Sequence, residues 1–307
     1  MPEKNNYFLR LRAKVTLKGH WQTALLVLIV ASLLGWISQA VSLIQGNTLR
    51  QQLLGALMQA DAATLANPGF WKQALALQFG PERLLSNLLA LASWLAAPMF
   101  TLGAINYFLQ LLRGNKEQSW TVIFSRANIW LKGLGTTLLV LGRLLLWALP
   151  GLAVLVAVMW ITLSVESLGG FAASWLVTMS IVGYIGMLIP MIRASFTYAM
   201  SMHFQADHPD WRCRDCVNAS KTMMQGQRLN LFMMYISFIG WQLMIGLVSD
   251  MVMMLLGQLF YLIINLGLGL ALSVYQNCSI CAFYEAWREP VTGDDPLREA
   301  GENGTVI

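Results

Sequence analysis

Four cysteines in two Cys-x-x-Cys pairs are the residues of this chain best suited to carry chemistry. The pairs are Cys213 with Cys216 and Cys278 with Cys281, and His208 lies just before the first. Structural zinc takes four ligands of these types, so the five residues are candidate zinc ligands. However, zinc-binding pairs normally lie on turns, and both pairs here fall within expected helices, where small buried thiols pack well. We expect packing cysteines with no metal and no cofactor, and we keep zinc as the alternative.

Two arginines lie inside long apolar runs of the sequence. Arg143 sits about three helical turns into the third run, and Arg193 lies near the inner end of the fourth. Charged residues within a membrane are costly and are functional hypotheses by default. A long side chain near a span end can instead extend to the lipid headgroups. We expect headgroup contact or pairing between helices, and a transport role for Arg143 is the alternative.

Catalytic motifs are absent from the sequence. There are three histidines, and no HExxH, GxSxG or Walker-type pattern occurs. Ser220 and Lys221 are adjacent on an expected helix, so they cannot face one another as nucleophile and base. Glu285 follows an aromatic pair at the inner end of the last run, where we interpret it as an interface or capping residue. The sequence therefore predicts no catalytic site and no enzyme.

The elements that must position these residues are long apolar helices. Between Trp21 and Trp287 the chain contains repeated runs of twenty or more apolar residues, and the composition is 57% hydrophobic with 11% charged. About twenty such residues in a helix span the hydrocarbon core of a bilayer. Only helices and closed barrels satisfy their backbone polar groups in lipid, and these runs are too long and unalternating for barrel strands. The fold class is therefore all-α, a polytopic integral membrane helix bundle.

Six spans account for the apolar runs. We place them at residues 21–44, 84–112, 134–163, 171–202, 229–249 and 259–287, within one membrane domain over residues 21–287. Residues 1–20 form a basic amphipathic lead, and residues 288–307 form a polar tail. A cleaved signal peptide is an alternative for the first run, but that run is long enough to span. Pro98, Pro150 and Pro190 lie inside spans and are expected kink points.

The basic residues give the orientation of the spans. With the N-terminus in the cytoplasm, 15 of the 20 Lys and Arg residues fall inside and three fall outside, namely Arg50, Lys72 and Arg83. Cytoplasmic connections carry the excess of positive charge in membrane proteins. We therefore predict that both termini are cytoplasmic. The formal net charge of +5 lies beside the spans, where it faces anionic lipid headgroups rather than nucleic acid.

Two connecting segments are expected to be amphipathic. The outer segment 46–83 is predicted to hold two short helices, one carrying Leu49, Leu53 and Leu57 and one starting at Asn67-Pro68, which together form a lid or lie in the interface. Residues 210–228 are predicted to form an inner amphipathic helix. Glu166 and Asp250 fall at expected outer turns. The inner elements favour membrane lipids with anionic headgroups, and a membrane-protein partner, as binding partners.

The order of several motifs resembles a known family. The motifs are Ala206-Asp207-His208-Pro209, Asn218-Ala219-Ser220-Lys221, Met224-Gln225-Gly226-Gln227-Arg228, Ser237-Phe238-Ile239-Gly240-Trp241 and Ala282-Phe283-Tyr284-Glu285. This order resembles the bacterial membrane-protein family called domain of unknown function 975, although His208 and Gln227 depart from its usual residues. The resemblance implies a helical fold and a bacterial inner-membrane location, and it implies no activity. A more distant similarity to the membrane domain of some glycerophosphodiester phosphodiesterases points to lipid handling.

Two classes of function follow from these observations. The first is a non-catalytic membrane module that binds lipid or another membrane protein, which fits the lack of catalytic motifs. The second is a permease or a transporter of lipid or small solutes, with its path between the kinked spans. An internal repeat would favour the second, and none is evident. We favour the module, with an enzyme that acts on lipid as a third reading.

Overall fold

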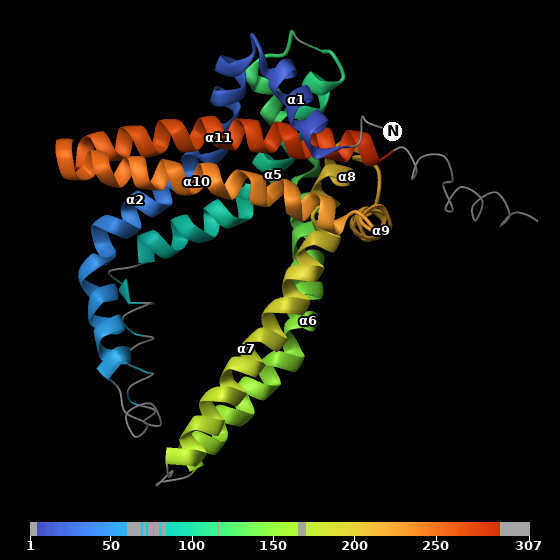
Figure 1. The fold of residues 1–307 in the computed structure, drawn as a ribbon. Helices are drawn as coiled ribbons and strands as arrows, with labels where there is room; N and C mark the ends of the chain where they lie inside the picture. The colour runs from blue at the N-terminus through green and yellow to red at the C-terminus, as the bar shows by residue number, and fades with distance from the viewer. Residues whose placement is uncertain are drawn as a thin grey trace, which may run out of the picture. The chain divides into compact units, whose positions relative to one another are not determined.

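The computed structural model describes residues 5–59, 69, 72, 76, 80, 81, 84–115, 117–164 and 170–288. Within these residues the chain is helical and contains no strand, which confirms the all-α class (Figure 1). The described helices are α1 (Asn6–Leu17), α2 (Trp21–Gln59), α5 (Leu84–Leu112), η3 (Trp120–Phe124), η4 (Ala127–Ile129), α6 (Trp130–Ser164), α7 (Gly170–Tyr198), α8 (Ser201–Asp207), α9 (Cys213–Met223), α10 (Arg228–Leu256) and α11 (Gln258–Trp287).

Six segments of the described chain are long and apolar enough to cross a membrane, as the sequence predicts. They are Trp21–Val41, Leu84–Leu112, Trp120–Val158, Thr178–Asp207, Arg228–Leu256 and Ile263–Trp287. Their mean hydropathy, between 1.4 and 2.2, is typical of membrane-spanning helices, because a helix at the surface of a soluble protein keeps a polar face. The chain is a multi-pass membrane protein.

Several helix bounds differ from the sequence prediction. The expected separate helix that carries Leu49, Leu53 and Leu57 is wrong, because α2 runs unbroken to Gln59. Gly46 weakens a helix by about 1 kcal/mol and does not end one. The second expected helix, at Asn67-Pro68, falls outside the described residues. The expected turn at Asp250 is also wrong, since apolar residues after it extend α10 to Leu256.

Prolines lie inside three of the helices without ending them. Pro98 lies in α5, Pro150 in α6 and Pro190 in α7, and each helix continues on both sides. The third span therefore crosses Pro150 as one helix. Neighbouring helices and local adjustment can accommodate the lost backbone hydrogen bond in membrane helices.

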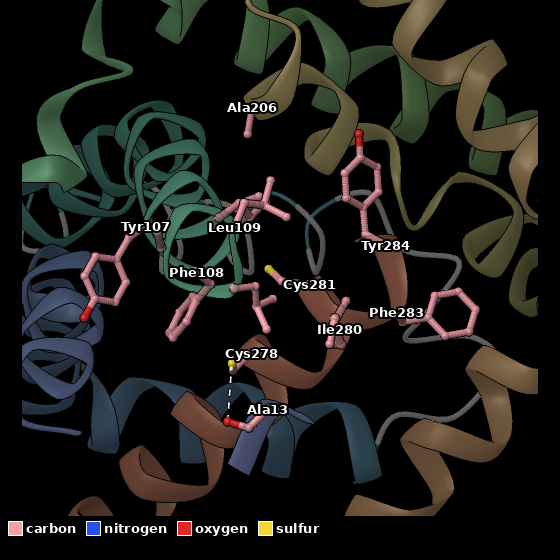
Figure 2. Packing of buried hydrophobic residues seen from close by; sticks show 14 of the residues in the cluster. Ala13, Tyr107, Phe108, Leu109, Ala206, Cys278, Ile280, Cys281, Phe283 and Tyr284 are labelled. Atoms are coloured by element: carbon pink, nitrogen blue, oxygen red, sulfur yellow. Dashed lines mark hydrogen bonds between the residues drawn. The ribbon is translucent and has the colours of Figure 1, made fainter. Parts of the chain in front are cut away.

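The chain divides into two units, and the divisions fall inside helices. Unit 1 comprises Met1–Ala31, Pro98–Val140 and Phe196–Ile307, and unit 2 comprises Ser32–Ala97 and Leu141–Ser195. Unit 1 holds a buried hydrophobic cluster with contributions from α1, α5, α8 and α11 (Figure 2). In α1, Asn5 caps the N-terminus, and Leu9, Ala13 and Leu17 share the buried face at four-residue spacing. This packing fixes α1 against α11.

The long helices α10 and α11 lie side by side in unit 1 and are joined by Gly257 (Figure 1). Gly257 has φ +87° and ψ −179°, a conformation that is open essentially to glycine alone. A single residue thus reverses the chain between two helices of 29 and 30 residues. The pair presents two parallel walls of side chains.

Candidate functional site

A cluster of charged side chains gathers at the end of α8 in unit 1. Asp207 Oδ1 lies 2.7 Å from Arg113 Nη2, and Asp207 Oδ2 lies 2.8 Å from Arg288 Nη1. The hydroxyl of Tyr284 donates to Asp207 Oδ2 at 3.1 Å. The Asp207 side chain is only 6% exposed, so its charge depends on these partners.

Glu285 closes the cluster from the other side. Its Oε1 lies 2.7 Å from Arg113 Nε, and its Oε2 lies 2.9 Å from Arg288 Nε. Two guanidinium groups therefore alternate with two carboxylates; we call Arg113, Asp207, Glu285 and Arg288 the ion-pair cluster. Burial alone would lower the pKa of Arg113, but the hydrogen bond and charge of Asp207, together with Glu285, outweigh it and raise that pKa.

Aromatic rings cover the ion-pair cluster. The His208 ring stacks on Trp211 with centroids 4.3 Å apart, and the Phe204 ring meets Tyr284 edge-on at 5.0 Å. His203 is buried against the other side of Tyr284, with ring centroids 5.7 Å apart. The rings limit water around the carboxylates, which strengthens the ion pairs.

The ion-pair cluster joins helix ends rather than supplying a reactive group. Arg113 directly follows α5, Asp207 ends α8, and Glu285 and Arg288 lie at the end of α11. Each carboxylate is held by both arginines, and the two positive and two negative charges balance. The arrangement is a clamp on three helices.

A groove with a basic end lies elsewhere in unit 1, along α1, α10 and α11. It encloses a cavity of about 520 Å³. Arg10 and Lys14 line it from α1, and Trp21 lines it from the start of α2. One face of α10 and one face of α11 form the walls, with Phe238, Trp241, Met244, Ile245 and Val248 on the first and Leu268, Ala271, Leu272 and Tyr275 on the second. We call this the basic-headed groove.

The basic-headed groove has a polar end and an apolar end. The hydroxyl of Tyr275 donates to the backbone oxygen of Arg10 at 3.3 Å, and the rings of Phe238 and Tyr275 meet edge-on with centroids 5.5 Å apart. These contacts place Phe238 and Tyr275 beside α1. Val248 and Leu268 lie nearer the turn at Gly257, because α10 and α11 are antiparallel. The groove therefore runs from two cations into a wholly apolar channel.

The four cysteines lie in unit 1 as two pairs, the first on α9 and the second on α11. The Cys213 thiol donates to the backbone oxygen of Lys132 at 3.2 Å, and the Cys278 thiol contacts that of Ala13 at 3.9 Å (Figure 2). Cys216, Cys278 and Cys281 are buried. Burial, with Cys213 and Asp215 nearby, raises the pKa of Cys216 to about 12, so this thiol stays protonated and binds metal poorly.

The structure does not bring the candidate zinc ligands together. Across the described residues, no group of three or more His, Cys, Asp and Glu side chains could hold a metal ion. His208 stacks on Trp211 and lies 3.7 Å from Asp207 through Nε2, beside the ion-pair cluster. The four cysteines and His208 are therefore not assembled as the zinc site considered from the sequence.

The two intramembrane arginines lie in unit 2. Arg143 is half-buried on α6, and Arg193 is exposed on α7. Headgroup contact or pairing between helices stays a prediction for both arginines.

Sequence reasoning missed the ion-pair cluster. It placed Asp207 within a family motif, and it interpreted Glu285 as an interface or capping residue. The partners come from positions 113, 207, 285 and 288, and no local spacing in the chain links them. Charge gave a partial signal, since each of the four residues ends an apolar run on the side predicted to be cytoplasmic.

Comparison with known proteins supplies a family and nothing more specific. The family model described as "Protein of unknown function (DUF975)" matches residues 1–290. Neither the curated proteins nor the solved structures gave a match.

Proposed function

Since this chain belongs to the DUF975 family of proteins of unknown function, we propose a function from its own geometry. The protein is a non-catalytic membrane module that binds membrane lipid in the basic-headed groove. We place it in the cytoplasmic membrane of a bacterium with both termini in the cytoplasm, in keeping with the position of its Lys and Arg residues.

The observation that carries the proposal is the groove itself. Its walls come from one face each of two long membrane helices, and nine apolar or aromatic side chains of α10 and α11 line them. A volume of about 520 Å³ lies within the range of small-molecule sites, which is roughly 300–1,000 Å³. An apolar channel open beside the membrane suits a lipid chain. A polar solute would lose its hydration there without gaining hydrogen bonds.

The absence of catalysis is supported by how the charged side chains are used. The carboxylates and guanidinium groups of the ion-pair cluster neutralise one another. The groove residues provide two cations and hydrophobic surface, with no acid, base or nucleophile activated by a neighbour. This combination binds a molecule and leaves it unchanged.

Native mass spectrometry of the protein released from membranes in mild detergent tests the proposal. We expect one retained lipid per chain, because the groove is of the size of one ligand. The Ala271→Phe variant places a ring in the groove and should lose that lipid. The matched variant Ala153→Phe adds the same ring at an exposed position of α6 and should retain it.

A chain that carries no lipid, or an equal lipid load in both variants, would overturn the proposal. A second protein chain in place of lipid would point to the membrane-protein partner instead. Uptake of a radiolabelled solute into vesicles that contain the protein would favour the transporter.

A further inference from the structure

We propose that the ligand of the basic-headed groove is a single anionic phospholipid, with its phosphate against Arg10 and Lys14 and an acyl chain between α10 and α11. This inference rests on the proposed function and goes beyond it, since a lipid-binding groove could equally accept a zwitterionic lipid. It assigns the chemical class of the ligand and the two residues that select it.

The two cations are held in place and are free of carboxylates. Arg10 and Lys14 lie one helical turn apart on α1, so they point to the same side. The neighbouring face of α1 is buried through Leu9, Ala13 and Leu17, which fixes the helix beside the groove. Within the part of the chain that the structure describes, no Asp or Glu lies within ion-pair distance of either cation. An anion that enters the groove therefore meets uncompensated positive charge.

The contrast with the ion-pair cluster supports this assignment. There, Arg113 and Arg288 each contact two carboxylates, which neutralise the positive charge of the two guanidinium groups. The Arg10 side chain donates instead to an uncharged group of its own helix, with Nε 3.4 Å from the backbone oxygen of Asn6. Unit 1 thus has arginines that hold the fold and a cationic pair that is available to a ligand.

The depth of the groove matches one leaflet of a bilayer. From Phe238 to Val248 the wall of α10 covers ten residues, which is about 15 Å at the rise of a helix. The hydrocarbon core of a bilayer is about 30 Å thick, so the acyl chains of one leaflet occupy about the same depth. A phospholipid with its phosphate at Arg10 would therefore place its chain along the full wall.

The exposed side of α1 places the cations at headgroup level. Phe8, Leu11 and Val15 are 44%, 43% and 65% exposed, and they follow one another at helical spacing. A basic helix with such an apolar stripe lies in the membrane interface with the stripe in lipid. Arg10 and Lys14 on the same helix then lie at the depth of the phosphates. Trp21 and Trp241, which also line the groove, are of a residue type enriched at that depth.

The test is lipid binding by native mass spectrometry with defined lipids. Delipidated protein in mild detergent is mixed with phosphatidylglycerol or with phosphatidylcholine of the same acyl chains, and the fraction of one-to-one adduct is measured. Each cation near an anionic headgroup favours binding about fivefold, so the pair should give about a thirtyfold preference for phosphatidylglycerol. A third arm adds excess inorganic phosphate, which should leave the lipid adduct in place.

Variants assign the preference to the two cations. Arg10→Gln with Lys14→Gln should bring the preference close to one. Lys14→Gln alone, at an exposed position that the fold tolerates, should reduce it about fivefold. The matched control is Arg12→Gln with Lys18→Gln, which removes two charges from the same segment outside the groove and should leave the preference unchanged.

Equal binding of the two lipids overturns this inference but leaves the proposed function standing. An unchanged preference in the Arg10 and Lys14 variants overturns it too, because the selectivity would then arise elsewhere. Displacement of phosphatidylglycerol by inorganic phosphate would show a phosphate site without a lipid requirement and would also overturn it. Absence of any lipid adduct would remove the proposed function itself.

Discussion

In unit 1 the ends of α5, α8 and α11 meet through charged side chains, whereas in unit 2 α6 and α7 meet through glycine. Asp207 and Glu285 each bind both Arg113 and Arg288 in the first case. In the second, a Cβ at Gly151 would lie 2.6 Å from Met187 Cα, and one at Gly183 would lie 3.0 Å from Val154 Cγ1.

The difference reflects the solvent at each place. Small residues let helix backbones approach closely, which suits helices in lipid, where no hydrophobic effect drives them together. Ion pairs need partial access to water, because the full desolvation of a charge costs more than one pair returns. Arg113 and Arg288 keep 36% and 30% of their side chains exposed. Charged side chains can therefore join the helix ends in unit 1. In unit 2, close packing at glycine joins α6 and α7.

The largest effect should come from Asp207→Ala, which breaks the clamp in unit 1. Arg113, Arg288 and Tyr284 would lose a shared acceptor, and we expect unfolding free energy to fall by roughly 3 kcal/mol. Denaturant unfolding in detergent, followed by circular dichroism, measures the change. Asp210→Ala removes an exposed acid three residues away and should cost under about 0.5 kcal/mol. Equal losses in the two variants would show that the ion-pair cluster contributes no stability.

A smaller effect is expected from Gly151→Ala in unit 2. The added Cβ would press on the backbone of Met187, so α6 and α7 would have to separate, at a cost of about 2 kcal/mol. Gly142→Ala is the matched control, since nothing lies within 4 Å of a Cβ there. That variant should be neutral or gain up to about 1 kcal/mol, because alanine is the better helix former. If both variants unfold alike, close packing is not what joins these helices.

The smallest effect should come from Thr136→Val, which removes one neutral hydrogen bond from unit 1. The buried Thr136 hydroxyl donates to Gln205 Oε1 at 3.0 Å and links α6 to α8. Its loss should cost about 1 kcal/mol in the same unfolding experiment. Thr222→Val is the control, because that exposed hydroxyl bonds to the backbone oxygen of Asn218 within its own helix. A ranking with Thr136→Val above Asp207→Ala would contradict the dominance of charge in unit 1.

The helical class and the six spans could be read from the sequence because hydropathy is a local property. Each span needs about twenty apolar residues in a row, and the sequence shows them directly. The ends of the helices were harder to predict. Gly46 begins the segment predicted to follow the first span, but α2 continues through it. Asp250 was predicted at a turn, but it lies within α10. A single residue that disfavours helix in lipid costs less than the unpaired backbone left by ending the helix there.

Neither site of unit 1 could be found in that way, because each depends on long-range pairing. Asn6 lies 224 residues before Asn230, yet its side-chain amide donates to the backbone oxygen of that residue in α10. The basic stripe of α1 was visible in the sequence. The side chains that form the apolar walls of the groove could not be identified from the sequence. A membrane helix is apolar on all its faces, so hydrophobic periodicity does not mark the face that lines a groove.

The one-residue turn at Gly257 also has a consequence for how the protein is made. It offers no polar loop to carry across the bilayer, so α10 and α11 must enter the membrane together as a hairpin. Both walls of the basic-headed groove then arrive in the same insertion step. α1 is synthesised before both walls, so the groove is complete only when Tyr275, its last lining residue along the chain, has left the ribosome.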